Sequence, residues 1–288
     1  MRVLVLGAGY SGKAIGAAFK SQGAEVFGTT RSEAKMPALQ ALGITPLLFD
    51  GADLSDELGA VMGTATHLVQ SIAPGRDGDP LFRPGLPAVA DLMPALEWAA
   101  YLSTVGVYGD HKGGWVDEDT PCHPVSDRSV ERVMAEDSWL AFGAEQDLPV
   151  AVLRLSGIYG PGRNAFRNLE NGTARRLIKK DQVFNRIRVE DIAASSMFLA
   201  KRKTGGIFNI TDQEPAPPQD VVSEAARLMG VEPPAETQFE TADLSPMARS
   251  FYGENKRVSN HKIRDLGFEF RFPDYRISLE HLWTSQRF

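Results

Sequence analysis

Val3-Leu4-Val5-Leu6-Gly7-Ala8-Gly9-Tyr10-Ser11-Gly12 is the stretch of sequence that decides the fold. Its four apolar residues predict a strand that is covered on both faces of a sheet, and its three glycines have the spacing G-x-G-x-x-G. Apolar residues then recur at helical spacing, namely Ala14, Ile15, Ala18 and Phe19. A glycine turn between a buried strand and an amphipathic helix is typical of a site where a helix N-terminus binds phosphate.

Each glycine has its own role in this interpretation. Gly7 permits a tight turn, Gly9 lets the backbone approach a pyrophosphate, and Gly12 allows the helix to pack closely on the strand. Tyr10 and Ser11 lie between them and are further candidates for cofactor contact. The alternative is a glycine-rich turn that binds nothing. Because strand, glycines, helix and chain position agree, we expect the segment to bind a nicotinamide dinucleotide.

The end of the second predicted strand bears on the choice of dinucleotide. About 20 residues after the glycines, an acid would hold the ribose 2′-hydroxyl of NAD. The chain reads Gly28-Thr29-Thr30-Arg31-Ser32 there, and no acid is present. An arginine beside a hydroxyl suits a 2′-phosphate, so NADP(H) is favoured over NAD(H). The alternative is that Arg31 is a solvated surface charge. Asp50 and Ser71 are further candidates for cofactor contact.

The first half of the chain alternates between short apolar runs and helical patterns. The runs are Val3–Leu6, Val26–Gly28, Pro46–Phe49, His67–Ser71, Tyr101–Thr104 and Val150–Leu155, and the helical patterns between them include Gly12–Gln22 and Ala88–Ala99. This succession predicts an α/β protein with a doubly wound parallel sheet of the Rossmann type.

The second half predicts a smaller C-terminal substrate lobe. A loop and helix over residues 161–180 precede sheet-like stretches at Ile187–Val189 and Gly206–Ile210, and helical patterns follow at Asp220–Met229 and Ser259–Leu266. We expect residues 1–160 with about 181–212 to form the dinucleotide-binding domain. Residues from about 161 to 180, with 213–288, would form the lobe.

Composition excludes several classes of function. The net charge is −6, from 31 Lys and Arg against 37 Asp and Glu, which gives no basic footprint for nucleic acid or for an anionic membrane. Cys122 is the single cysteine, and the five histidines show no metal-ligand spacing. No segment offers the run of about 20 apolar residues that a membrane helix needs. We expect a cytoplasmic protein without a metal.

Several motifs together resemble the extended short-chain dehydrogenase/reductases, that is, the NAD-dependent epimerase/dehydratase family. The matching stretches are Tyr101-Leu-Ser-Thr-Val-Gly-Val-Tyr-Gly109, Leu153-Arg-Leu-Ser-Gly-Ile-Tyr-Gly-Pro-Gly162, Arg186-Ile-Arg-Val-Glu-Asp-Ile192, Gly206-Ile-Phe-Asn-Ile210, Asn255-Lys-Arg-Val-Ser-Asn260 and Leu266-Gly-Phe268. They cover nearly the whole chain in order. The resemblance implies a Rossmann-type fold and a bound dinucleotide.

The resemblance also implies a catalytic serine or threonine after the fifth strand, followed by Tyr-x-x-x-Lys on the next helix. The hydroxyl role falls on Thr104, with Ser103 beside it. The alternative is that these hydroxyls only satisfy the end of the strand. On the helix, Arg128 stands in place of the tyrosine and Arg132 in place of the lysine. Arg132 can still hold the cofactor ribose, whereas a guanidinium cannot shuttle protons.

A literal Tyr-x-x-x-Lys runs from Tyr108 to Lys112, but it lies in a turn-like sequence, so its spacing does not imply a shared helical face. If another residue replaces the missing acid, Tyr108 is the candidate. Loss of the usual pair resembles the atypical branch of the superfamily, and within it the bacterial YeeZ-type group.

A basic stretch stands out in this acidic chain between Arg154 and Arg188. In the family, the loop after Tyr-Gly-Pro-Gly lines the substrate cleft, so we expect Arg163, together with Arg167, to bind an anionic group of the substrate. The alternative is a solvated face with structural ion pairs.

Two functions follow from these observations. One is an NADP(H)-dependent oxidoreductase or epimerase-like enzyme that acts on a small-molecule substrate with a carbonyl or nucleotide-sugar-like structure and lacks Tyr-x-x-x-Lys. The alternative is a non-catalytic dinucleotide-binding sensor or regulatory protein. Because the family often forms dimers, a homodimer is one of the alternatives for the oligomeric state.

Overall fold

The computed structural model describes residues 1–245 and 249–288, which fall into two compact units. Unit 1 comprises Met1–Val107, Pro124–Leu155 and Ile192–Phe208, and unit 2 comprises Tyr108–His123, Ser156–Asp191 and Asn209–Phe288. Each unit is therefore assembled from three separate stretches of the chain. The assignment of a substrate lobe stays a prediction.

A seven-stranded parallel sheet with the order β11-β7-β5-β4-β1-β2-β3 forms the centre of unit 1. Its strands are β1 (Arg2–Leu6), β2 (Glu25–Thr30), β3 (Thr45–Leu48), β4 (His67–Gln70), β5 (Trp98–Thr104), β7 (Val150–Leu155) and β11 (Gly206–Ile210). The order reverses at β1, where β2 and β4 flank the first strand on opposite sides. This arrangement is the expected Rossmann-type sheet, in which ligands bind beyond the carboxyl ends of the strands at the reversal.

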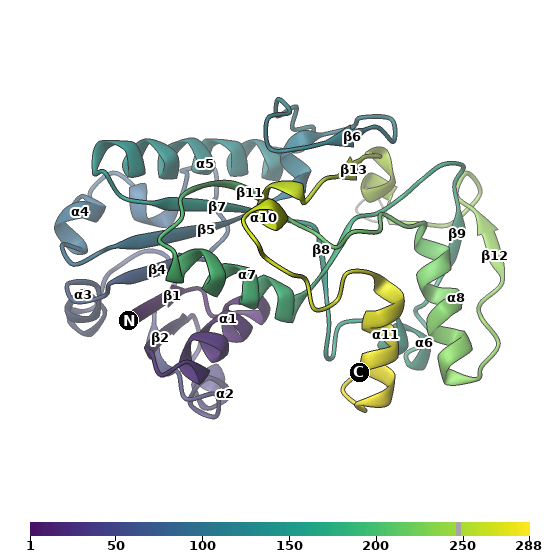
Figure 1. Ribbon diagram of the computed structural model, residues 1–288, viewed down its shortest axis with the longest axis horizontal. Coiled ribbons are helices and arrows are strands. Elements are labelled where there is room, and N and C mark those ends of the chain that lie inside the picture. Colours follow the sequence, from purple (N-terminus) through teal and green to yellow (C-terminus); the bar gives the residue numbers. More distant parts are fainter. Residues whose placement is uncertain (246–248) are drawn as a thin grey trace. The chain divides into compact units, whose positions relative to one another are not determined.

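Helices cover both faces of this sheet (Figure 1). In the view shown, α5 (Asp127–Glu145) runs along one face, and α1 (Tyr10–Ser21) and α7 (Val189–Lys201) lie on the other. The remaining helices of unit 1 are short: α2 (Met36–Gln40), α3 (Asp56–Met62) and α4 (Val89–Leu92), with single 3₁₀ turns at Glu33–Lys35 and Pro80–Phe82. A further 3₁₀ turn, Val105–Tyr108, ends on the first residue of unit 2. Coverage on both faces explains why every residue of β4 and β7 is buried.

Unit 2 is built from short elements. Its strands pair in twos, β8 (Gly157–Tyr159) with β10 (Arg186–Arg188), β9 (Arg176–Ile178) with β12 (Glu236–Gln238), and β6 (Trp115–Val116) with β13 (Arg257–Val258). Its helices are α6 (Ala165–Glu170), α8 (Pro218–Met229), α10 (His261–Asp265) and α11 (Tyr275–Thr284), with a 3₁₀ turn at Phe251–Gly253. Phe166, Ala225, Tyr275 and Leu282 form an apolar core between α6, α8 and α11.

One predicted helix is wrong. The sequence pattern suggested a helix over Ala88–Ala99, whereas α4 ends at Leu92 and β5 already begins at Trp98. Pro94 explains the early end, because a proline drives the preceding residue out of the helical region. Met93 has φ −129° and ψ 59°. The apolar residues that follow belong to the buried strand.

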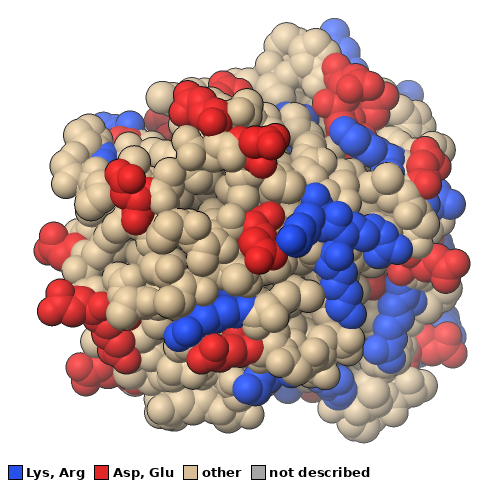
Figure 2. All heavy atoms as spheres, turned by 60° about the vertical axis from the view of Figure 1, so that its left-hand side comes forward, with Lys and Arg blue, Asp and Glu red and all other residues tan. Residues whose placement is uncertain are grey.

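The surface carries both signs of charge. On the face drawn in Figure 2, acidic and basic side chains are interspersed, with one gathering of lysines and arginines. None of the helices in the described part of the chain is long and apolar enough to span a membrane.

Candidate dinucleotide and catalytic site

The glycine turn of unit 1 is as tight as its sequence predicts. β1 ends at Leu6 and α1 begins at Tyr10, so Gly7, Ala8 and Gly9 form the whole connection. Gly7 has φ +82°, and a Cβ on it would lie 2.8 Å from Cγ1 of Ile72. A Cβ on Gly12 would lie 2.7 Å from the Gly7 carbonyl oxygen. Both positions therefore require glycine.

Gly9 differs from the other two glycines because space is open above it. A Cβ there would meet the Gly7 oxygen at 3.9 Å and no other described atom within 4 Å. Gly9 is the exposed N-cap of α1, it offers no side chain to the helix, and the first turn holds no acid. The N-terminal N–H groups of a helix attract anions. These features fit the pyrophosphate of a dinucleotide.

The end of β2 lies beside this turn. The Gly7 N–H donates to Oγ1 of Thr29 over 2.8 Å, and the Ala8 N–H donates to the Thr29 carbonyl over 2.8 Å. Arg31 follows as an exposed residue, and Ser32 is half-buried. The strand therefore ends with an arginine and a hydroxyl, but no acid, at the position that recognises the adenosine ribose in dinucleotide-binding Rossmann folds.

Asp50 and Ser71 follow β3 and β4. Asp50 is exposed, and its Oδ1 accepts the Ala52 N–H over 2.9 Å, which closes a local turn. Ser71 is half-buried, and its N–H donates to the Leu6 carbonyl over 2.9 Å. The carbonyl carbon of Ser71 would lie 3.3 Å from a Cβ on Gly7. Ser71 is therefore placed directly against the glycine turn.

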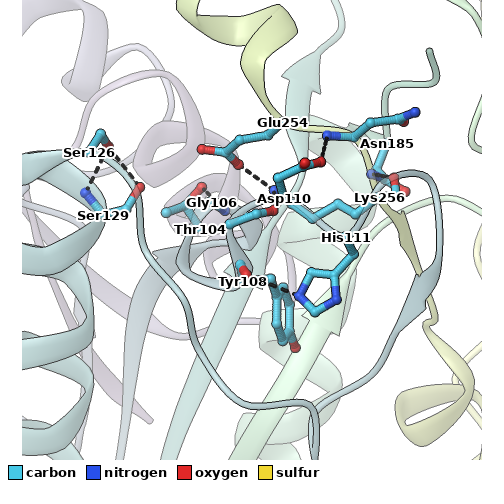
Figure 3. Close-up of polar contacts among 12 residues, drawn as sticks. Thr104, Gly106, Tyr108, Asp110, His111, Ser126, Ser129, Asn185, Glu254 and Lys256 are labelled. Carbon is cyan, nitrogen blue, oxygen red and sulfur yellow. Dashed lines mark hydrogen bonds and ion pairs between the residues drawn. The ribbon is translucent and has the colours of Figure 1, made fainter.

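A group of hydroxyls gathers where β5 ends and α5 begins. The Gly106 N–H donates to Oγ1 of Thr104 over 3.1 Å (Figure 3). A Cβ on Gly106 would lie 3.1 Å from Oγ of Ser129 and 3.4 Å from Oγ1 of Thr104. Ser126 caps α5 and donates to Oγ of Ser129 over 3.0 Å. Thr104 is half-buried.

Ser103, which neighbours Thr104, points into the core of unit 1. It is 5% exposed, and its hydroxyl donates to Oε1 of Glu136. Glu136 is in turn held by Arg154, whose Nη2 lies 2.7 Å from Oε2. The hydroxyl of Ser103 is thus part of a buried ion-pair cluster.

The two arginines on α5 lie in different environments. Arg128 is exposed. Arg132 is half-buried, and its Nη1 donates to the Leu102 carbonyl and, over 3.3 Å, to the Tyr101 hydroxyl. The guanidinium of Arg132 therefore binds the end of β5 itself. Burial raises the pKa of Tyr101, which keeps this phenol protonated.

Tyr108 belongs to unit 2 and is fully buried there. Its phenol donates to Oδ1 of Asn209 over 2.8 Å, and its carbonyl lies 3.1 Å from Nε2 of His111 (Figure 3). Lys112 is exposed in a left-handed turn with φ +51°. The literal Tyr-x-x-x-Lys is therefore not a pair on one helical face.

Most of the basic stretch serves the structure of the two units. Arg188 is fully buried between Glu190 and Ser278, and Arg167 pairs with Glu170 over 2.8 Å. Other members bind carbonyls or carboxylates within unit 2, namely Arg175, Arg176, Lys179 and Arg186. Arg163 is exposed in the turn that joins it to Gly160.

Sequence reasoning missed Ser126 and Ser129. The spacing Ser126-x-x-Ser129 before a helix signals a cap, but only the fold brings Ser129 beside Gly106. Among the described residues, no group of three His, Cys, Asp or Glu side chains is placed to hold a metal ion.

Comparisons with known proteins show to which family this chain belongs. The sequence model of the NAD dependent epimerase/dehydratase family matches residues 89–211. The protein YeeZ of Escherichia coli strain K12 is 32% identical over 95% of this chain and 97% of its own length. A 3-diazoavenalumate denitrifying reductase of a Streptomyces species is 26% identical over 81% of this chain and 83% of its own length.

A solved structure is similar over the full length. A functionally unknown conserved protein from Silicibacter pomeroyi DSS is 43% identical, with a TM-score of 0.86 over 100% of this chain and 99% of that one. These matches confirm the resemblance and the Rossmann-type fold that the sequence motifs predicted. The chain belongs to the NAD-dependent epimerase/dehydratase family and is a homologue of YeeZ.

Proposed function

We propose that this protein is an NADP(H)-dependent oxidoreductase that reduces a carbonyl or similar electrophilic group of a small molecule. The observation that carries the proposal is the glycine turn of unit 1. Gly7 and Gly12 admit no side chain, while Gly9 faces open space at an uncapped helix N-terminus. Such a turn fits a pyrophosphate, whose close approach accounts for a glycine at position 9, where packing alone does not require one.

The preference for NADP(H) over NAD(H) rests on the end of β2. An acid that would hold a ribose 2′-hydroxyl is missing there, and Arg31 is exposed beside the hydroxyl of Ser32. A guanidinium forms strong charge-assisted hydrogen bonds with phosphate oxygens. Arg31 and Ser32 would hold the 2′-phosphate.

The chemistry rests on Thr104. The cofactor supplies a hydride when it is bound. The Thr104 oxygen accepts the Gly106 N–H, which leaves the hydroxyl proton for a substrate oxygen. Reduction adds the hydride to the carbonyl carbon and a proton from solvent to the oxygen, and Thr104 would orient and polarise that oxygen. Ser126 and Ser129 extend this group of hydroxyls toward solvent, since Ser126 is exposed.

The substrate is proposed to carry an anionic group. Arg163 is exposed in the turn that follows Gly162, and the guanidinium of Arg167 pairs with Glu170. Arg163 would bind the anion by charge-assisted hydrogen bonds, and Arg167 would join it if its ion pair with Glu170 opens.

A non-catalytic sensor is the second candidate. Two observations favour it: the phenol of Tyr108 is bonded to Asn209, and the guanidinium of Arg132 is bonded to the end of β5. Neither side chain can replace the missing Tyr-x-x-x-Lys pair without breaking these contacts. In that case the dinucleotide would bind without being turned over.

The test is single-turnover hydride transfer. The protein, loaded with NADPH, is mixed with a panel of aldehydes, ketones, quinones and nucleotide-sugars, and NADPH consumption is followed by absorbance. The proposal predicts consumption with one class of compound, and loss of at least about 100-fold in rate in Thr104→Val, with NADPH affinity unchanged. Tight NADPH binding without consumption by any class would favour the sensor. Equal rates in Thr104→Val and wild type would refute the role of Thr104.

A further inference from the structure

A chain of buried hydrogen bonds ends at the glycine turn of unit 1. Gln70, Asp79 and Trp139 are each 1% exposed or less. The Gln70 Nε2 donates to Oδ1 of Asp79 over 2.8 Å, and the Trp139 Nε1 donates to Oδ2 of Asp79 over 3.1 Å. On its other side, Oε1 of Gln70 accepts the N–H of Ile72 over 3.2 Å. This series of hydrogen bonds thus connects α5 with the residues that follow β4.

Ile72 is where this chain meets the glycine turn. Its backbone nitrogen would lie 3.1 Å from a Cβ on Gly7, and its Cγ1 would lie 2.8 Å away. The space between Gly7 and Ile72 thus admits no side chain, so a shift of Ser71 and Ile72 would change the surroundings of the turn. Gln70 is the side chain that holds the Ile72 N–H in this place.

Asp79 is an unusual anchor for such a chain. Three donors reach its carboxylate, the third being the Leu81 N–H over 2.9 Å, and none of these three is a cation. Burial raises the pKa of Asp79, and the three hydrogen bonds oppose that shift. The charged or titratable groups that face it are Arg132 from α5 and Tyr101 from β5. A buried acid that is bonded only to neutral donors lowers the free energy of unfolding, so we expect it to have a role beyond packing.

We propose that Gln70, Asp79 and Trp139 are positioning residues of the dinucleotide site, which hold Ser71 and Ile72 against Gly7 and thereby set the affinity for the cofactor. The inference rests on the proposed binding of NADP(H). It adds a link between α5, which carries Ser129 and Arg132, and the turn that receives the pyrophosphate. The three residues act through Ile72.

The sharpest variant is Gln70→Glu. It keeps the size of the side chain and the acceptor for Ile72, but it places a second carboxyl against Asp79 at hydrogen-bond distance. Two buried carboxyls this close share one proton and titrate as a pair. At low pH the shared proton replaces the Gln70–Asp79 hydrogen bond, whereas at high pH the two charges repel each other. An ordinary packing defect would show no such dependence on pH.

The experiment measures the dissociation constant for NADPH in wild type, Gln70→Glu, Trp139→Phe and the control Gln146→Glu. Gln146 is the exposed C-cap of α5, so the control adds the same charge at a distance from the chain of hydrogen bonds. The ratio of variant to wild type is taken at each pH between about 5 and 9, which cancels the titration of NADPH itself. Hydrogen exchange of the Ile72 amide is measured without cofactor.

We expect the ratio for Gln70→Glu to rise from near one to about tenfold across this range, which corresponds to about 1.4 kcal/mol. Exchange of the Ile72 amide should accelerate in parallel, and the ratio for Gln146→Glu should stay near one. Trp139→Phe removes the indole N–H together with one ring of the side chain and should weaken NADPH binding several-fold at every pH, which provides a test even if Gln70→Glu fails to fold. Wild-type affinity in both variants would overturn this inference alone. A wild-type protein that binds neither NADPH nor NADH would overturn the proposed function and this inference with it.

Discussion

Ser103 and Thr104 carry adjacent hydroxyls, of which the first is buried and the second half-buried. Replacing them one at a time distinguishes an effect on stability from an effect on hydride transfer. Ser103 donates to the buried carboxylate of Glu136, which Arg154 also holds. A hydrogen bond to a charged group contributes about 1.5–3 kcal/mol. Ser103→Ala should therefore lower the melting temperature by about 3–12 °C, since 1 kcal/mol corresponds to about 2–4 °C in chains of this order of size.

The ion pair beneath Ser103 gives a larger effect. Glu136 is 2% exposed and Arg154 is 4% exposed, so Arg154→Met leaves a buried carboxylate without its cation. Removal of one partner from a buried pair costs about 3–5 kcal/mol, which predicts a melting temperature about 6–20 °C lower. The double variant Glu136→Leu/Arg154→Met should recover most of this loss, because apolar replacement of both partners is often neutral.

The assay is thermal unfolding followed by circular dichroism, combined with NADPH titration and single-turnover hydride transfer on the same samples. Ser103→Ala should lose stability but keep its NADPH affinity and its rate of hydride transfer. Thr104→Val should keep its stability and its NADPH affinity but lose hydride transfer. If Ser103→Ala melts like the wild type and loses hydride transfer, then Ser103 is the catalytic hydroxyl and the account of β5 given above is refuted.

Three further predictions concern the cofactor, the substrate and pH. Arg31→Ala should weaken NADPH binding by about tenfold, or about 1.4 kcal/mol, and leave NADH binding unchanged in the same titration; an equal loss for both nucleotides would contradict a 2′-phosphate contact. Arg163→Ala should raise KM for an anionic substrate with little change in kcat, while Arg175→Ala, which removes an exposed arginine bonded to the Asp243 carbonyl, serves as the control; an unchanged KM in Arg163→Ala would exclude Arg163 from the site. Burial raises the pKa of Asp212 well above its usual value, so the folded state binds this proton more tightly than the unfolded chain. The contribution of Asp212 to the free energy of unfolding is fully present below the pKa of the unfolded chain, about 3.9. It is lost as pH rises through the raised pKa of the folded state. Urea unfolding at several pH values should therefore show a component of the slope that Asp212→Asn removes, and an identical slope in both proteins would contradict this origin.

The parts of the fold that the sequence predicted are those set by local pattern. The strands β1, β4 and β7 each contain an apolar run, and the glycine turn has a spacing that few other structures require. The helix expected over Ala88–Ala99 failed because an apolar run of that length suits either a helix or a buried strand. Pro94 was the local signal that could have decided it.

The candidate site was less predictable because its contacts join residues distant in sequence. The burial of the Tyr108 phenol depends on Asn209, which is 101 positions away. Nothing near Tyr108 in the sequence indicates that partner. The same holds for Arg188 in the basic stretch, whose guanidinium donates to the hydroxyl of Ser278, 90 positions away. A sequence pattern identifies which side chain could act, whereas the fold determines which other residues that side chain contacts.

The central claim, that the glycine turn of unit 1 binds a nicotinamide dinucleotide, is tested most directly by Gly9→Asp. Gly9 is the N-cap of α1 with φ −77°, and a side chain there meets open space. Aspartate is a favoured N-cap residue, so the variant should fold with equal or greater stability. Its carboxylate would occupy the position proposed for the pyrophosphate and repel it. We predict wild-type or higher melting temperature together with loss of NADPH binding by at least about 100-fold, or about 2.7 kcal/mol. NADPH binding by Gly9→Asp with wild-type affinity would contradict the account.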